Sequence, residues 1–348
     1  MIQKLITEIE KQGNNHPDLS LRGFYKALLE LIETHPKTKN YLVEALSKRT
    51  DVETTHLVNL AYRAMQFVLI YEHEKKDMGE YTYEIWKEVI TNLMDNEKTY
   101  TIIIEKTLKE NTQTNIYQRY AGPKAILSKL YGTKKIDVID VGCSQNIGLM
   151  GLELHYPFMQ IKDHTKSKEL TKLLNNDLNI KNATGIDIED PSKKLGWALA
   201  CRFYPKELKQ FDMEEQMIRF FKNQSKNTKF IKESVLKLSK LWEKQKFQKV
   251  DAVVTSLILY QLPEGLKEKA IEEIGKILKD GGVLIINDFV KVNSHIKWNV
   301  PWFENGQSNY KTIVLKKTKD TFSEPLEYIL WDSGRCQEAY PGKDFNNI

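Results

Sequence analysis

The sequence predicts an α/β fold in which an all-α N-terminal region precedes a doubly wound, mainly parallel sheet. Apolar residues recur at helical spacing from the start of the chain to about residue 111. Beyond residue 134, short apolar runs alternate with helical patterns, as in parallel strands joined by helices. One run, Ile136–Val141, passes into a loop of small residues, which is how a nucleotide-binding strand leads into its helix.

Two domains are expected, a helical one over residues 1–111 and a second over residues 112–348. Helical spacing in the first is clearest around residues 24–32, 57–68 and 85–93. Turn-forming residues at 13–17, 35–36 and 77–79 separate the helices.

Seven strands are expected in the second domain. The five central ones read as apolar runs bounded by turns. The last two are expected to close the sheet as an antiparallel hairpin. The predicted strands are Ile136–Val141, Ala183–Ile188, Lys229–Glu233, Val250–Ser256, Val283–Asp288, Lys311–Lys316 and Leu326–Trp331.

The loop after the first strand has the pattern Asp-x-Gly-x-Ser-x-Asn-x-Gly, not the dinucleotide fingerprint Gly-x-Gly-x-x-Gly. It resembles motif I of the class I S-adenosylmethionine-dependent methyltransferases. Ser144 and Asn146 stand where that superfamily usually has glycine, and both are tolerable because Ser is small and Asn enters left-handed conformations easily. The residues expected to hold the cofactor here are Asp140, Gly142, Cys143, Ser144, Asn146 and Gly148.

A second acid, Asp187, ends the next predicted strand and is followed by Ile188. A carboxylate at this place can accept both ribose hydroxyls of a nucleoside; the alternative is a loop carboxylate or helix cap before Pro191. Asp187 lies 39 residues after Gly148, whereas a minimal unit has about 20. The segment His164–Leu178 is therefore expected to insert an extra helix, which we place near the cofactor as a cover.

Later segments extend the resemblance in the superfamily's order. Glu233 and Ser234 follow the third strand, where a terminal acid often faces adenine, and Thr255 lies in the fourth strand. A helical pattern, then Leu278-Lys279-Asp280-Gly281-Gly282 and an apolar strand come next. The resemblance implies a Rossmann-like, seven-stranded methyltransferase sheet and S-adenosyl-L-methionine as cofactor.

A closer resemblance covers most of the chain. It is to a largely uncharacterised bacterial family of unknown function, with a helical N-terminal region before a methyltransferase-like sheet. The residues that carry the likeness are Gln113, Thr114, Asn115, Arg119 and Ala121, then Gly185-Ile186-Asp187 with Asp190-Pro191 and Tyr204-Pro205, then Thr255-Ser256 with Tyr260-Gln261-Leu262-Pro263.

The polar residues before the first strand have two interpretations. Asn115 and Arg119 lie where a preceding segment can cover the cofactor, and an arginine there can bind the methionine carboxylate through two hydrogen bonds. They can equally cap and tether the connection between the domains. Tyr117 and Tyr120 either line the pocket or pack between domains, and packing is the favoured interpretation.

Methyl transfer from a sulfonium needs an in-line nucleophile and, for some acceptors only, a base. Candidate bases are Asp288, His155 and His295, each of which has an ordinary structural alternative. Two nucleobase-methylation motifs, Asn/Asp-Pro-Pro-Tyr and Pro-Cys, are absent, which favours an oxygen or nitrogen of a small molecule, peptide or protein side chain. Aromatic residues after the fifth strand form either an acceptor wall or part of the core; they are Trp298, Trp302 and Phe303.

Composition is that of a soluble protein and identifies no partner. The net charge is +5 from 52 basic and 47 acidic residues, too mild to require nucleic acid, although lysines gather over residues 222–249. Three cysteines without a Cys-x-x-Cys pair predict neither a disulfide framework nor a metal site and favour the cytoplasm. No membrane span is expected. A module that has lost transfer activity and an RNA methyltransferase are the alternatives.

Overall fold

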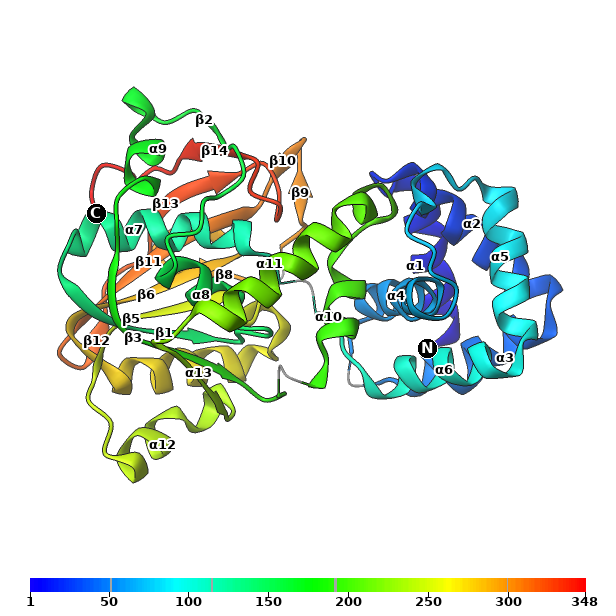
Figure 1. Cartoon of the computed structure of the whole chain (residues 1–348), viewed down its shortest axis with the longest axis horizontal. Coiled ribbons are helices and arrows are strands. Elements are labelled where there is room, and N and C mark those ends of the chain that lie inside the picture. The colour runs from blue at the N-terminus through cyan, green and yellow to red at the C-terminus, as the bar shows by residue number, and fades with distance from the viewer. Residues whose placement is uncertain (51, 114, 191–192, 299) are drawn as a thin grey trace. The chain divides into compact units, whose positions relative to one another are not determined.

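The computed structural model describes residues 1–50, 52–113, 115–190, 193–298 and 300–348. Two compact units are present (Figure 1): Met1–Thr114 with Lys194–Met217, and Asn115–Lys193 with Ile218–Ile348. Thr114 and Pro191, which belong to the motifs above, lie outside the described residues. Within the described part of the chain, no helix combines the length and the apolar character that a membrane span requires.

The first unit is helical, as predicted. Its helices end and begin at the expected breaks, because local side chains cap them: Asp18 accepts a hydrogen bond from the N–H of Leu21 (3.1 Å), and Pro36 opens a helix where its missing N–H costs nothing. The helices are α1 (Ile2–Asn15), α2 (Leu19–Thr34), α3 (Pro36–Glu44), α4 (Thr54–Glu72), α5 (Tyr83–Asp95) and α6 (Glu97–Lys109).

A later segment of the chain also belongs to this unit. It contains α10 (Leu195–Arg202), the short helix η6 (Pro205–Gln210) and the start of α11 (Phe211–Gln224). The indole of buried Trp197 donates to the Asn111 carbonyl (2.8 Å), and the Gln66 amide donates to the Phe203 carbonyl (3.0 Å). The predicted domain boundary at residue 112 did not include the return of the chain to the helical unit over residues 194–217.

The second unit is built on a sheet that has ten strands among the described residues. Its order is β2-β14-β13-β11-β6-β5-β1-β3-β4, with β12 beside β11. The seven predicted strands are all present. They are β1 (Lys135–Val141), β3 (Asn179–Asp187), β4 (Thr228–Lys232), β5 (Val250–Ser256), β6 (Leu278–Phe289), β11 (Tyr310–Thr318) and β13 (Leu326–Trp331).

Strand direction is uniform over one part of this sheet and alternates beyond it. The five strands from β4 to β6 run parallel, whereas β11 pairs antiparallel with β6 and β13 antiparallel with β11. The closing hairpin is thus confirmed. Three short strands of this sheet were not predicted: β2 (Lys162–Asp163), β12 (Thr321–Phe322) and β14 (Glu338–Pro341).

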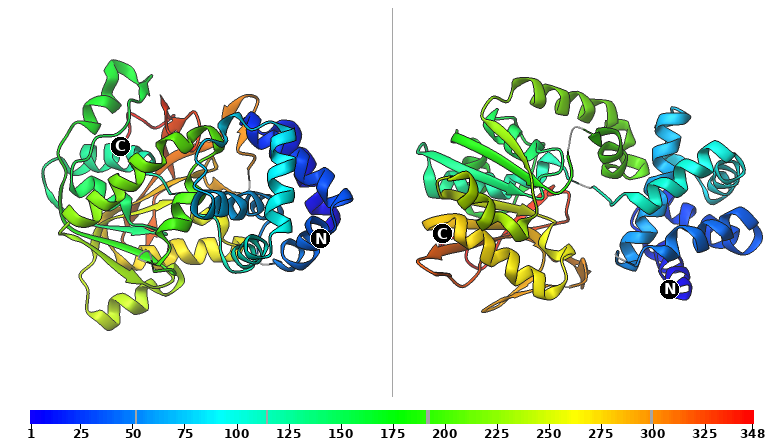
Figure 2. Two further views of the ribbon diagram at one scale, coloured as in Figure 1. Left: turned by 45° about the vertical axis from the view of Figure 1, so that its right-hand side comes forward. Right: turned by 90° about the horizontal axis from the view of Figure 1, so that it is seen from below.

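Helices cover both faces of the sheet, which explains why the central strands are continuous apolar runs. Figure 1 shows α7 (Ala121–Tyr131) on one face, with α12 (Leu238–Gln245) and α13 (Glu264–Ile277) on the other, and Figure 2 gives two further views. Apolar residues of α12 and α13 form one continuous core with β1, β5 and β6.

The prediction that His164–Leu178 covers the cofactor is wrong. Its extra helix exists as α9 (Glu169–Leu174), but α9 packs against α7, and β2 before it pairs with β14 at the end of the sheet opposite β4. Four hydrogen bonds from Thr165 and Thr171 to the Asp163 carboxylate fix the segment there.

Candidate functional site

The site lies where the order of the strands reverses. After β1 and the short edge strand β2, the chain forms β3 and β4 on one side of β1, and it then returns to place β5 on the other side of β1. Ligands of open α/β sheets bind in the crevice at the carboxyl ends of the two strands that flank such a point. Here the loops after β1 and β5 meet, because a Cβ on Gly142 would lie 2.8 Å from Ile258. Gly142 also has a φ of +74°. Both the close approach of Ile258 and this backbone conformation therefore favour glycine at this position.

The loop after β1 is glycine-poor but follows the expected path. Ser144 and Asn146 take left-handed conformations, with φ of 48° and 56°. Gly142 and Cys143 donate their N–H groups to the Ile186 carbonyl (2.8 and 3.3 Å), and the Ser144 N–H donates to the Asp187 carboxylate (2.8 Å). The loop after β1 is therefore fastened to the end of β3.

Side chains from outside the loop hold it as well. The Asn115 amide donates to the Cys143 carbonyl (3.0 Å), and the Asn146 amide donates to the Lys229 carbonyl on β4 (3.2 Å). Burial, together with the charges of Asp140 and Asp187, raises the pKa of the Cys143 thiol, which stays protonated. Cys143 is consequently a packing residue of the loop.

Asp140 is fully buried in β1, just before the loop. One carboxylate oxygen accepts a hydrogen bond from the Tyr120 hydroxyl (2.6 Å), and the Asn115 amide lies 3.3 Å from the same hydroxyl. Burial raises the pKa of Asp140 to about 8, against the opposing effect of the Tyr120 hydrogen bond. The group is mostly a neutral acid at neutral pH.

Asp187 ends β3 beside this loop. Its carboxylate accepts the N–H groups of Ser144 (2.8 Å) and Glu189 (3.2 Å), while burial raises its pKa. The N–H of Glu233 donates to the Asp187 carbonyl (3.0 Å), and Ser234 caps the short helix after β4. Asp187, Glu233 and Ser234 thus lie together at the ends of β3 and β4, next to the exposed Ile188.

Five buried polar atoms in this region have no hydrogen-bond partner among the described residues. Such atoms cost about 1–3 kcal/mol each when left unpaired. Four lie in or against the loop after β1, and the fifth is in β5, where Thr255 is paired with Val141. They are Asn115 Oδ1, Asp140 Oδ1, Gln145 Nε2, Asn146 Oδ1 and Thr255 Oγ1.

Asp288 lies at the end of β6, on the other side of β5. Its oxygens accept the N–H groups of Phe289 (2.9 Å) and Tyr260 (3.2 Å). Burial raises its pKa to about 7; the two hydrogen bonds and the charges of Lys267 and Arg119 oppose the rise. Asp288 therefore lies at the carboxyl edge of the sheet, as predicted.

Arg119 is directed toward β6 rather than toward the loop after β1. Its Nε donates to the Gly334 carbonyl (2.8 Å), and its own carbonyl accepts from the Asn287 amide (2.6 Å). Because its guanidinium contacts the Gly334 segment, the structure does not bring it to the five unpaired atoms.

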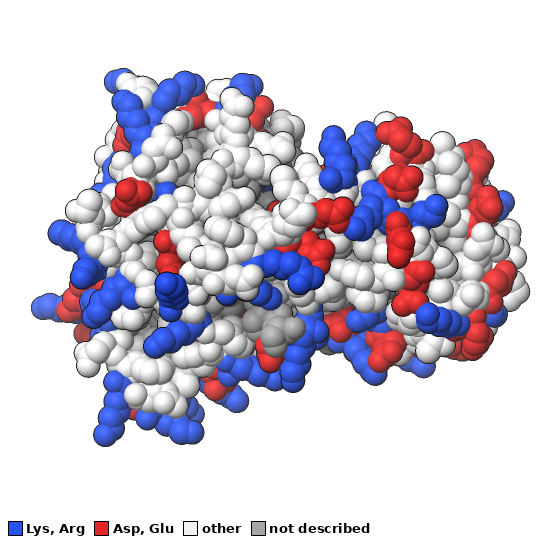
Figure 3. All heavy atoms as spheres, in the orientation of Figure 1, with Lys and Arg blue, Asp and Glu red and all other residues white. Residues whose placement is uncertain are grey.

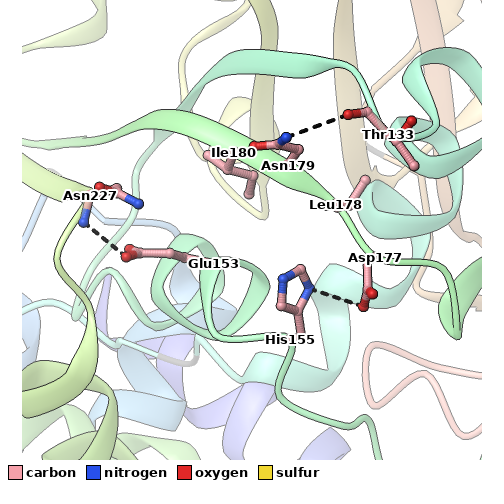
Figure 4. Close-up of a pocket in the computed structure, with 8 residues that line it drawn as sticks. All are labelled: Thr133, Glu153, His155, Asp177, Leu178, Asn179, Ile180 and Asn227. Atoms are coloured by element: carbon pink, nitrogen blue, oxygen red, sulfur yellow. Dashed lines mark hydrogen bonds and ion pairs between the residues drawn. The ribbon is translucent and has the colours of Figure 1, made fainter.

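The structure also removes two of the three candidate bases from the site. His155 follows α8 (Ile147–Glu153), which carries the chain away from the loop after β1; its ring lies 3.7 Å from Asp177 at the amino ends of the strands. There it lines a cavity of about 380 Å³ with Asn179 and Asn227 (Figure 4). His295 is exposed at the tip of the hairpin of β7 (Lys291–Val292) and β8 (Ile296–Lys297).

The aromatic residues after β6 differ in burial, so they do not all have the same role. Trp298 is buried, with the Lys267 ammonium 5.7 Å from its ring centre. Trp302 stacks on Phe289, with ring centres 5.2 Å apart, and Phe303 is half exposed. Trp302 is thus in contact with the residue that follows Asp288.

Sequence reasoning missed the role of Tyr120, whose ring packs on α8 where a Cβ at Gly148 would overlap it. The same holds for Tyr117 and Gly151, three residues further along α8. The spacing Gly148-x-x-Gly151 on one helix face is the signal that identifies this packing. Gln145 and Lys222, joined by a 2.9 Å hydrogen bond, were also missed.

Comparison with known proteins gives a family for part of the chain. Residues 199–330 match a family model described as a methyltransferase domain. The match covers less than half of the chain and begins after β3. No curated protein matches the chain.

Some of the solved structures that are similar to this chain are methyltransferases. One is PKMT2 from Rickettsia typhi in complex with AdoHcy, with 16% identity, a TM-score of 0.29, and 49% of this chain and 25% of that chain covered. Another is the N-methyltransferase NodS from Bradyrhizobium japonicum in complex with S-adenosyl-L-homocysteine, with 16% identity, a TM-score of 0.28, and coverage of 51% and 64%. The chain therefore spans less than two thirds of either protein. The sheet thus has the strand order of a class I methyltransferase-like fold, and residues 199–330 are similar to a methyltransferase domain.

Proposed function

We propose that the chain is an S-adenosylmethionine-dependent methyltransferase that acts on an oxygen or nitrogen of a small molecule, peptide or protein side chain. One observation carries the proposal. Five buried polar atoms that have no hydrogen-bond partner in the described part of the chain lie around the loop after β1 at the reversal of strand order, next to the Asp187 carboxylate. A ligand with hydroxyl, amine and carboxylate groups would pair them.

The residues fit a nucleoside cofactor from end to end. Asp187 keeps lone pairs beyond those used by Ser144 and Glu189 and would accept the ribose hydroxyls. Glu233 and Ser234, fixed beside it, would face the base. Asp140 Oδ1 and Thr255 Oγ1 would meet the amino-acid end of the cofactor. When bound, the cofactor supplies a methyl group activated by a sulfonium.

Asp288 would take the proton that an oxygen or nitrogen acceptor loses. It stands at the carboxyl edge, and both of its oxygens are oriented by backbone N–H groups. A carboxyl group whose pKa is near 7 is partly ionised at neutral pH and is well matched to accept a proton. Trp302, stacked on Phe289, would exclude water from the acceptor.

Calorimetric titration with S-adenosylhomocysteine tests the cofactor assignment. We expect micromolar binding by the intact chain and at least about tenfold weaker binding by Asp187→Asn, because a hydrogen bond to a charged group contributes roughly 1.5–3 kcal/mol. Asp177→Asn is the matched control, since Asp177 is an exposed carboxylate at the opposite edge of the sheet.

Absence of binding by the intact, folded chain would contradict the proposal and favour a module that has lost transfer activity. Loss of affinity in Asp177→Asn to the same degree as in Asp187→Asn would show that the edge with the unpaired atoms is not the site.

An RNA acceptor is the second candidate, because nine lysines and two acidic residues lie within residues 222–249. Figure 3 shows basic side chains over the α12 region. This candidate predicts RNA binding whose affinity falls steeply with salt. Binding that is absent at 50 mM salt would exclude it.

A further inference from the structure

Gln145 occupies the middle of the loop after β1, and its side chain is only 1% exposed. The Lys222 ammonium donates to Gln145 Oε1 at 2.9 Å, which fixes the orientation of the amide. Gln145 Nε2 is left as a buried donor without a partner among the described residues. An ammonium and an unpaired amide donor therefore lie side by side.

Two such donors are complementary to one carboxylate. A carboxylate has two oxygens and accepts hydrogen bonds from a lysine ammonium and an amide N–H at the same time. Pairing a buried donor that otherwise costs about 1–3 kcal/mol makes this contact favourable. An ammonium ligand, by contrast, would meet repulsion from Lys222.

Lys222 is exposed, but the turn of α11 that carries it is anchored by the neighbouring Phe221. Phe221 packs edge-on against Tyr117 and Tyr156, with ring centres 5.5 and 4.8 Å apart, and Tyr117 in turn lies on Gly151 of α8. The helical turn that carries Lys222 is thus fixed to the helix that follows the loop after β1.

We propose that Lys222 and Gln145 form the subsite for the carboxylate of the cofactor's amino-acid moiety, in the role that the sequence offered to Arg119. The inference rests on the proposed function. Lys222 lies outside the segments with recognisable motifs. Its proposed role is to help distinguish the complete cofactor from an adenosine thioether that lacks the amino-acid moiety.

The experiment compares two ligands by calorimetry: S-adenosylhomocysteine, which has the amino-acid moiety, and 5′-methylthioadenosine, which lacks it. We expect Lys222→Gln to weaken binding of S-adenosylhomocysteine roughly 10- to 100-fold, the range for one hydrogen bond to a charged group. Binding of 5′-methylthioadenosine should change less than about twofold. Lys226→Gln is the control and should behave as the intact chain, because Lys226 is a second exposed lysine, four residues after Lys222.

Gln145→Glu supplies an independent variant. Its carboxylate would pair with Lys222 and repel the carboxylate of the ligand, so it too should weaken S-adenosylhomocysteine selectively. Retained binding of 5′-methylthioadenosine shows in each variant that the rest of the pocket is folded.

Two results would overturn the inference. Equal weakening of both ligands by Lys222→Gln would mean that Lys222 only braces the loop after β1, and unchanged binding of both would mean that the carboxylate lies elsewhere. Failure of the intact chain to bind either ligand would instead defeat the proposed function itself, and the inference with it.

Discussion

At the scale of single residues, the buried acids Asp140 and Asp288 make stability depend on pH. In the unfolded chain an aspartate has a pKa near 3.9, whereas burial raises the pKa to about 8 for Asp140 and about 7 for Asp288. Between these values the folded state holds protons that the unfolded state releases. The free energy of unfolding therefore falls as pH rises, by about 1.4 kcal/mol per pH unit for each group.

We expect Asp140→Asn and Asp288→Asn each to reduce that slope between about pH 5 and 7, and the double variant to reduce it further. Asn resembles the neutral acid in shape and can still accept the Tyr120 hydrogen bond in Asp140→Asn. Urea unfolding at a series of pH values measures the slope. Slopes that match the intact chain in all three variants would show that neither acid binds its proton in the folded state.

Residues of the candidate site also show how much of it could be predicted from the sequence. Asp140 and Asp187 were predictable because an acid at the end of an apolar strand has a position fixed by the sheet. His155 was not, because proximity in sequence to the loop after β1 does not reveal that α8 leads the chain to the opposite edge. Tyr120 was not either, since its partner Asp140 lies 20 residues away.

At the scale of elements, the contact between α8 and the short helix η3 (Tyr117–Tyr120) depends on two glycines. A methyl group at Gly148 would overlap the Tyr120 ring, and one at Gly151 would overlap the Tyr117 ring. This contact positions the Tyr120 hydroxyl on Asp140 and fixes the start of α8 beneath the loop after β1.

We expect Gly148→Ala to destabilise the chain by about 1–3 kcal/mol, the usual cost of overpacking. Tyr120→Ala removes the ring, so the double variant should show a coupling energy of about 0.5–3 kcal/mol. Gly265→Ala, in α13 with no atom within 4 Å of the added Cβ, is the matched control and should be neutral or slightly stabilising. Strict additivity of the Gly148 and Tyr120 substitutions, measured by urea unfolding, would contradict this packing.

The elements themselves were largely predictable where a run was long and apolar. All seven expected strands exist, because burial on both faces leaves a continuous apolar signature. The two-residue strands β2 and β12 carry no such signature. The location of α9 was also beyond prediction, since the pairing of β2 with β14 joins residues more than 170 apart.

At the scale of the whole molecule, the chain passes between its two units three times, near residues 114, 193 and 217. The sequence did not reveal the second and third crossings. The pattern of α10 is that of any helix covering a sheet, and only the contacts of Trp197 and Phe203 with the helical unit show where it belongs.

Removal of residues 1–114 should therefore expose residues 194–217 rather than leave an intact sheet domain. Trp197, Phe203 and Leu208 are buried within the helical unit, so in a 115–348 fragment their apolar surface would face water and the segment would lose its structure. We expect trypsin to cut this fragment at Lys206 and Lys209 much faster than it cuts the intact chain. A second fragment with residues 194–217 replaced by a glycine–serine linker should resist digestion. Equal resistance of the intact chain and the first fragment would mean that the segment folds without the N-terminal helices, and that the division of the chain at residue 112 describes its folding units after all.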